Sequence, residues 1–178
     1  MGKEVNYPVP NTKEGMFLQN KNCNERIYIY LLLRSKCNTA NDETHRYVER
    51  MSNEQIAKDL GLNRNTVGKR LKDLITFGYV IKEGKYYKVP KTDYFRLIPQ
   101  QTLDFLLNYI ENKDRIIKLY IVLYDYYIMH KTFSMQDLHE ALGYSLTKAK
   151  KPDSNNTKHI QTCLMLLSES GLVDYQIK

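Results

Sequence analysis

Ten polar side chains between positions 63 and 88 are suited to recognising a phosphate or a nucleobase. Arginine and asparagine can pair bidentately with guanine and adenine edges, whereas threonine and lysine can contact phosphate oxygens. Seven of the ten lie within ten consecutive positions, and the other three follow at intervals of three. The candidates are Asn63, Arg64, Asn65, Thr66, Lys69, Arg70, Lys72, Lys82, Lys85 and Lys88. This set predicts an interface for nucleic acid.

Positive charge is concentrated around these candidates. The 178 residues include 27 Lys or Arg and 20 Asp or Glu, which gives a net charge of +7 and a pI near 9.2. Residues 58–91 hold nine basic and three acidic side chains, a net charge of +6, whereas residues 133–178 hold five of each. A basic balance favours a polyanionic partner, with nucleic acid ahead of an anionic membrane. The charge therefore assigns the interface to the first half of the chain.

Capping and apolar residues predict two short helices joined by a tight turn. The first covers Asn53–Leu60. Ser52 caps it, with Gln55 three positions later as in a capping box, and Gly61 ends it. The second helix starts after an asparagine cap at position 63 or 65 and runs to residue 77. Such a pair holds the second helix clear of the body, so that its exposed face can enter the major groove of DNA, which is roughly 12 Å wide.

Apolar residues line one face of this second helix. They are Val67, Leu71, Leu74 and Ile75, at spacings of four, three and one. Because this stripe is needed for the core, the polar candidates must lie on the other faces. Gly68 inside the helix costs about 1 kcal/mol relative to alanine. A close approach of DNA would explain a residue without a side chain there, and crowding against the first helix would do so equally.

A β-hairpin is predicted directly after the second helix. Residues 79–82 and 85–89 read as strands around a turn at 83–84, and three of the candidate lysines lie on them or between them. Tyr86 and Tyr87 point to opposite faces. One of them is expected in the core, and the other is free to stack on sugar-phosphate.

The flanking segments complete a winged helix-turn-helix over residues 22–91. An apolar, tyrosine-containing helix is expected over 24–36, and a short strand over 47–51. Outside the unit, an extended N-terminal arm precedes it. An extended stretch at 94–99 and a linking helix at 100–110 follow it.

The same pattern recurs in diverged form further along the chain. Phe133-Ser134 aligns with Met51-Ser52, and Leu142-Gly143 aligns with Leu60-Gly61. Counted back from Gly171, which aligns with Gly78, the apolar stripe recurs at Ile160, Leu164 and Leu167. The second copy carries 11 extra residues within 145–156, and its one expected strand, at 172–177, leaves its wing incomplete. Its candidate DNA contacts are Lys148, Lys150, Lys151 and Lys158.

The stretch SNEQIAKDLGLNRNTVGKRLKDLITFGYV, residues 52–80, resembles a bacterial winged helix-turn-helix. The wider layout resembles the DNA-binding regions of replication initiators from Gram-positive plasmids and phages. Those regions also begin with a short extended segment and a tyrosine-rich apolar helix, and some contain two winged helices in tandem. The resemblance implies binding to repeated origin or operator sequences. The interrupted turn and missing second wing of this chain depart from that pattern.

Patterns for other chemistry are lacking in the sequence. There is no glycine-rich phosphate loop, no His-Glu-x-x-His and no Cys-x-x-Cys. His159 and Cys163 have a spacing that suits a metal, but no clear third ligand accompanies them, so we expect no metal, no cofactor and no enzyme activity. No run reaches the roughly 18 apolar residues that span a bilayer. The N-terminus lacks the apolar core of a signal peptide, and the three cysteines read as reduced thiols, which favours the cytoplasm.

The sequence thus predicts a mainly α fold with a small β-hairpin (α+β), organised as a tandem winged helix-turn-helix. The expected parts are an extended arm (1–21), a winged-helix DNA-binding domain (22–91), a linker with a helix (92–112) and a diverged winged-helix-like domain (113–178). The expected function is sequence-specific binding of double-stranded DNA in plasmid- or phage-type replication initiation or transcriptional regulation. The competing interpretation is a protein-interaction module, a replication or assembly adaptor that does not read sequence. Further candidate partners are a second copy of the chain and a replication or transcription protein.

Overall fold

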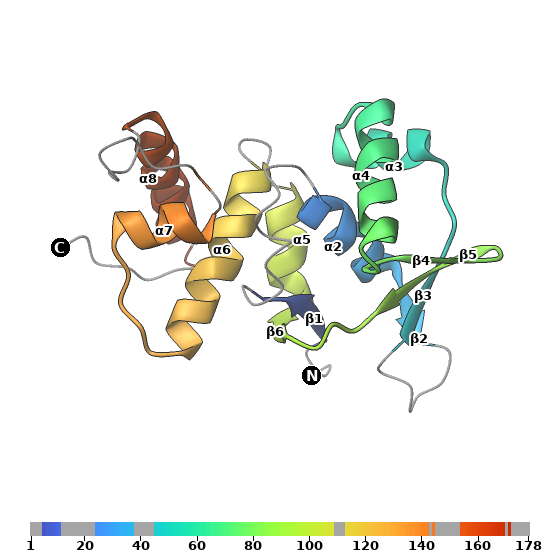
Figure 1. Cartoon of the computed structure of the whole chain (residues 1–178), viewed down its shortest axis with the longest axis horizontal. Helices are drawn as coiled ribbons and strands as arrows, with labels where there is room; N and C mark the ends of the chain where they lie inside the picture. Colours follow the sequence, from blue (N-terminus) through green and yellow to red (C-terminus); the bar gives the residue numbers. More distant parts are fainter. Residues whose placement is uncertain are drawn as a thin grey trace.

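The computed structural model of the chain describes residues 5–11, 24–37, 45–108, 113–142, 144, 154–169 and 171. Helices and two small antiparallel sheets make up the fold, in agreement with the predicted α+β class. The molecule is elongated, with the hairpin and its two neighbouring helices at one end of the long axis and the last helices at the other (Figure 1). Among the described residues, no helix is long and apolar enough to cross a membrane.

The first unit has the element order of a winged helix. Helix α2 (Asn24–Arg34) is buried from its first residue to Leu32 and packs against both a helix and a strand of the unit. The elements that follow are β2 (Lys36–Cys37), β3 (His45–Glu49), α3 (Asn53–Leu60), α4 (Arg64–Thr76), β4 (Ile81–Glu83) and β5 (Tyr86–Pro90). The four strands form one antiparallel sheet in the order β2-β3-β5-β4. The predicted helix-turn-helix and hairpin are therefore present, and the strand expected at 47–51 lies two residues earlier.

Local capping explains where α3 and α4 begin and end. The Ser52 hydroxyl accepts a hydrogen bond from the backbone N–H of Gln55 at 3.1 Å, which satisfies one of the free N–H groups of the first turn. Gly61 ends α3 with a φ of 64°, a left-handed conformation that glycine adopts without steric cost. Of the two asparagines expected as the next cap, Asn63 has this role, because its side chain accepts from the N–H of Asn65 at 2.8 Å.

The hairpin turn lies one residue later than predicted. Glu83 pairs with Tyr86, so the two loop residues are Gly84 and Lys85 rather than 83–84. Gly84 has a φ of 57°, and Lys85 is not among the residues with positive φ. A glycine at the first loop position is the arrangement of a type II′ turn, whose twist matches that of the two strands. The glycine thus sets the register of the hairpin.

The two segments predicted to be extended on either side of the first unit pair with each other. Strand β1 (Asn6–Pro10) runs antiparallel to β6 (Phe95–Pro99), with Val9 opposite Arg96. Helix α5 (Gln100–Asn108) follows directly and packs against α2. The chain therefore closes on itself around the first unit, an arrangement that neither segment indicates alone.

The described residues of the second unit form three helices. They are α6 (Lys113–Ile128), α7 (Met135–Ala141) and α8 (Ser154–Glu169). Ser134 and Asp137 form a capping box at the start of α7, at the place where Ser52 caps α3. The residues aligned with the α4 stripe, Ile160, Leu164 and Leu167, are all buried, and Gly171 follows with a φ of 77°, close to the 80° of Gly78. The strand expected at 172–177 and most of the insertion lie outside the described residues.

The first helices of the two units pack against each other. Helix α2 contacts α4 on one side and α5 and α6 on another. Within this junction the Lys118 amine lies 3.5 Å from a Glu25 carboxylate oxygen, and both side chains are at least 95% buried. A second pair joins the sheet to α6, since the Arg96 Nε lies 2.7 Å from the Asp125 carboxylate. Buried charged groups need partners, so the Lys118–Glu25 pair helps to fix how α6 meets α2, and the Arg96–Asp125 pair links β6 to α6.

Candidate nucleic-acid interface

Helix α4 has one buried face and one basic face. Val67, Leu71 and Leu74 are at most 4% exposed and pack into the core beneath the helix. The remaining faces hold the exposed candidates Arg64, Asn65, Lys69 and Lys72, together with the partly exposed Thr66. The cap, Asn63, is also exposed. The structure thus gathers these predicted residues on the side of α4 that turns away from the core.

Arg70 differs from the other candidates of α4. Its guanidinium lies 3.3 Å from the Asp73 carboxylate one turn further along, and only 15% of its side chain is exposed. Its charge is therefore largely neutralised within the helix. The paired Arg70 guanidinium is therefore better suited to stabilising α4 than to binding a phosphate of DNA.

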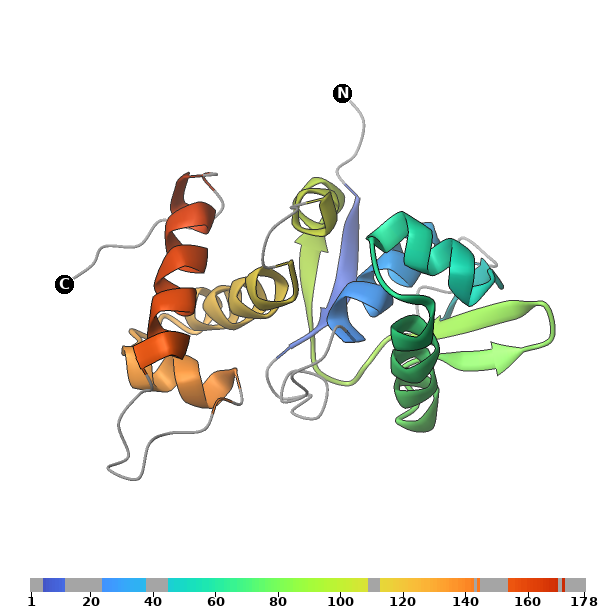
Figure 2. The same ribbon diagram turned by 90° about the horizontal axis from the view of Figure 1, so that it is seen from above.

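The wing places its lysines around the tip and both faces of the hairpin. Lys82 and Lys85 are exposed, and Lys88 is partly exposed with its amine 5.9 Å from the centre of the Tyr47 ring. Of the two tyrosines, Tyr87 is the core residue at 3% exposure, and Tyr86 is 50% exposed. Seen from above, the hairpin projects past α4 at the end of the molecule opposite α8 (Figure 2). The exposed basic groups of helix and wing therefore lie at one end.

Gly68 is explained by the contact between the two helices. A Cβ atom added at this position would lie 3.1 Å from the Asn53 side-chain nitrogen, on the first residue of α3. The crowding anticipated from the sequence is therefore present within the protein. It accounts for a small residue here without an approaching ligand.

A hydrogen-bonded cluster fastens α3, and through it α4, to α2. The Tyr30 hydroxyl donates to the Asp59 carboxylate, and Arg34 lies over the Tyr30 ring at 4.2 Å while pairing with Asp59 at 3.5 Å. The hydrogen bond from Tyr30 is the main cause that lowers the pKa of Asp59, and burial is the main cause that raises the pKa of Tyr30. Deeper in the interface, Arg26 donates to the Leu60 carbonyl at 3.1 Å and so satisfies a free C=O at the end of α3.

Arg50 belongs to the wing but was not among the predicted contacts. Its guanidinium donates to the Gly84 carbonyl at 3.2 Å and lies 5.5 Å from the Tyr87 ring centre, while its backbone N–H donates to Lys85. The side chain is exposed, so it adds a positive charge to the hairpin tip. Nothing in the local sequence signals this, because Arg50 reaches the turn only through the pairing of β3 with β5.

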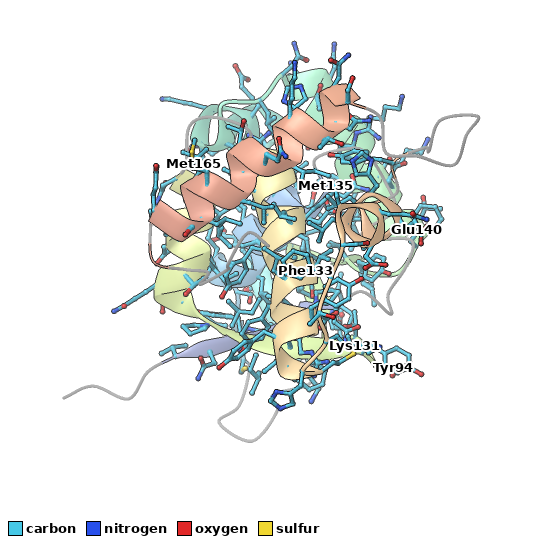
Figure 3. The ribbon with its side chains drawn as sticks, turned by 90° about the vertical axis from the view of Figure 1, so that its left-hand side faces the viewer. Tyr94, Lys131, Phe133, Met135, Glu140 and Met165 are labelled. Carbon is cyan, nitrogen blue, oxygen red and sulfur yellow. The ribbon has the colours of Figure 1, made fainter. Side chains whose placement is uncertain are left out.

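The described residues of the second unit bring little charge to the corresponding face. Of its four candidate lysines, Lys158 lies exposed on α8, and Lys148, Lys150 and Lys151 lie outside the described residues. Met165, on α8 in Figure 3, is 50% exposed at the position aligned with Lys72. His159 is exposed and Cys163 is 1% exposed, so the spacing noted for metal binding does not bring them to one surface. No cluster of three potential metal ligands occurs among the described residues.

Comparison with known families identifies the fold of the first unit. A family model described as a helix-turn-helix domain matches residues 26–80. The matched segment begins in α2, includes α3 and α4, and ends at the start of the hairpin. It supports a helix-turn-helix DNA-binding protein. Comparison with curated proteins and with solved structures gives no match.

Proposed function

We propose that this protein binds double-stranded DNA in a sequence-specific manner, and that it acts in plasmid- or phage-type replication initiation or in transcriptional regulation. The observation that carries the proposal is the division of α4 into a buried apolar stripe and an exposed basic face. Arg64, Asn65 and Lys69 stand on that exposed face at the start of the helix. The first residues of such a helix are the ones that reach base edges in the major groove.

The roles of the side chains follow from their chemistry. Arg64 and Asn65 are suited to bidentate pairing with guanine and adenine. Thr66, Lys69 and Lys72 contact phosphate on the groove walls, and the wing lysines with Arg50 contact the backbone or the adjacent minor groove. Phosphate contacts supply affinity and register, whereas base contacts supply specificity. Removing a phosphate contact should therefore lower the affinity for all sequences, whereas removing a base contact should lower the sequence preference.

We also propose that residues 113–178 are a diverged winged-helix-like domain. The capping of α7, the buried stripe of α8 and the positive φ of Gly171 support a common pattern with the first unit. The outer face of α8 is suited to protein rather than DNA, because beside Lys158 and Glu169 it carries Met165 and neutral polar side chains. A second copy of the chain or a replication or transcription protein is the partner that this unit would engage.

Anisotropy titrations at two salt concentrations test the proposal. Duplexes selected from a random library should bind tightly and resist nonspecific competitor. Arg64→Ala should relax the sequence preference, whereas Lys88→Ala should mainly reduce the dependence of affinity on salt. Lys131→Ala removes an exposed lysine outside both proposed surfaces and is the matched control, which should change neither. Micromolar binding that is indifferent to sequence would overturn the proposal in favour of an adaptor without sequence readout.

A further inference from the structure

The sheet of the first unit has an outer face, on which side chains of three neighbouring strands form two rows across the strands. Residues directly opposite each other on neighbouring strands share a face. Tyr86 lies opposite Glu49 on one side and opposite Glu83 on the other. Two residues along β5, Lys88 lies opposite Tyr47 and Ile81. The buried Tyr87 and Val89 point to the other face, into the core. The six side chains of these two rows form what we call the platform: Tyr47, Glu49, Ile81, Glu83, Tyr86 and Lys88.

Two aromatic rings are accessible on the platform. Tyr86 is 50% exposed, and Tyr47 is partly exposed. Their ring centres are 6.5 Å apart and their planes are inclined by 86°. Each ring holds the other in place through this edge-to-face contact, so little side-chain freedom is lost when a third ring stacks on them. Two preordered, accessible rings of this kind suit the flat faces of unpaired bases.

The platform also carries three charged side chains, which suit the phosphates and the base edges of a single strand. The Lys88 amine lies 5.9 Å from the Tyr47 ring centre and is partly exposed, in reach of a phosphate beside a stacked base. Glu49 and Glu83 are both exposed on either side of Tyr86. Carboxylates repel phosphates but accept hydrogen bonds from exocyclic amino groups, which cytosine has and thymine lacks. Their place beside the ring therefore favours the edge of a base over the backbone.

We propose that the platform is a second nucleic-acid site, which binds single-stranded DNA by stacking unpaired bases on Tyr86 and Tyr47. This activity goes beyond duplex recognition by α4, because it uses the opposite face of the sheet from the one that faces the core. Helices α3 and α4 stand on one side of the hairpin (Figure 1). Lys88 contacts the phosphate, and Glu49 and Glu83 accept from the amino groups of the stacked bases. A protein with both sites can hold a duplex and an opened strand together.

Fluorescence anisotropy with labelled oligo(dC) and oligo(dT) tests the platform in the full-length chain. Tyr86→Ala should weaken binding to oligo(dC) by roughly 5- to 100-fold, since a stacked base is worth that much. Tyr86→Phe keeps the ring and should restore the affinity. Tyr94 is also 50% exposed but lies outside the platform, so Tyr94→Ala is the matched control and should bind as the unmodified protein does. Thermal melting establishes that each variant is folded.

Two further measurements are the ratio of affinities for oligo(dC) and oligo(dT) and the affinity for duplex DNA. The unmodified protein should prefer oligo(dC) to oligo(dT) by roughly tenfold, and Glu83→Gln should narrow that ratio. Arg64→Ala should weaken duplex binding alone. Three results would show that the platform is not a single-strand site. Tyr86→Ala and Tyr94→Ala could bind oligo(dC) equally well, or Tyr86→Ala could weaken duplex binding as much as oligo(dC) binding. Alternatively, Tyr86→Ala could change only the self-association of the protein, measured by sedimentation. If the unmodified protein bound oligo(dC) but showed no sequence preference among duplexes, only the proposed function would be overturned.

Discussion

Helices α4 and α8 bury matching stripes and present different surfaces. Val67, Leu71 and Leu74 of α4 correspond to three buried residues of α8, and a glycine with positive φ follows each helix. Toward solvent, α4 presents a series of basic and amide side chains. On α8, Lys158 stands among neutral polar residues and an exposed methionine. The same packing framework therefore supports two surfaces of different chemistry.

This difference separates what folding requires from what binding requires. The buried stripe is fixed by the need to remove apolar area from water, and it is present in both helices. The outer face is free to vary, because substitutions there cost little stability. Where that face has collected positive charge, as on α4, the charge is a sign of a polyanionic partner. Where it has not, the helix keeps its structural role and is available to a partner of another kind.

The largest expected effect comes from the ion pair that joins the two units. Lys118→Met alone should lower the free energy of unfolding by about 3–5 kcal/mol, because it leaves the Glu25 charge buried without this partner. The double variant Glu25→Leu/Lys118→Met should recover most of that loss. Urea denaturation measures both. If the single variant were as stable as the unmodified protein, the pair would not hold the junction between the units.

Truncating the two stripes tests whether the helices are counterparts in packing. Leu74→Ala and Leu167→Ala should each cost about 2–5 kcal/mol, since both side chains are 1% exposed. Met165→Ala on the outer face of α8 is the control and should change stability by less than about 0.5 kcal/mol. Denaturant titration of the three variants gives the comparison. A cost for Leu167→Ala as small as that of the control would mean that α8 does not pack as α4 does.

Charge removal on the outer faces should affect DNA binding in one helix only. Arg64→Ala should reduce affinity for the preferred duplex by about 1–3 kcal/mol, the usual worth of a bidentate base contact. Lys158→Ala removes an exposed charge from α8 and should leave duplex affinity unchanged. Competitive gel shifts with cognate and scrambled duplexes measure both effects. Equal losses would assign DNA contacts to both units.

A smaller effect is expected at Gly68, which separates crowding between helices from contact with DNA. Alanine gains about 1 kcal/mol of helix propensity, but its Cβ would approach the Asn53 side chain at 3.1 Å. Gly68→Ala should therefore stabilise the protein by less than that amount. Adding Asn53→Ala removes the crowding, so the double variant should recover the rest of the gain in helix propensity. Duplex affinity should stay the same in both variants. A large loss of affinity would instead place DNA against the backbone at this position.

The smallest effect is a pH dependence caused by Asp59, which has no counterpart at the aligned position of the second unit. The pKa of Asp59 is lowered, mainly by the hydrogen bond from Tyr30, and the aligned position of the second unit is Ala141. A carboxylate with a lowered folded pKa adds stability above its unfolded value of about 3.9 and loses it as the pH falls through the folded pKa. Thermal melting should therefore show Asp59→Asn to be less stable than the unmodified protein at about pH 7, with the gap narrowing as the pH falls below about 4. A gap that does not change with pH would contradict this role.

Local signals predicted the elements that hold the site. The caps at Ser52 and Asn63, the glycine at 61 and the apolar spacing of α4 act within a few residues, so they are readable from the sequence. Features that depend on distant pairing were not readable. The pairing of β1 with β6 joins segments almost ninety positions apart, and β3 pairs with β5 across α3 and α4. Arg50 and the platform became visible only once β3 was placed beside β5.

Footprinting of the full-length protein on its preferred duplex tests the central claim, that recognition resides in α4 and the wing. Recognition by α4 and the wing should protect one major-groove segment together with the adjoining backbone. Both should be lost or blurred in Arg64→Ala and preserved in Lys158→Ala. A footprint with two major-groove segments, one of them lost in Lys158→Ala, would instead assign DNA recognition to both units.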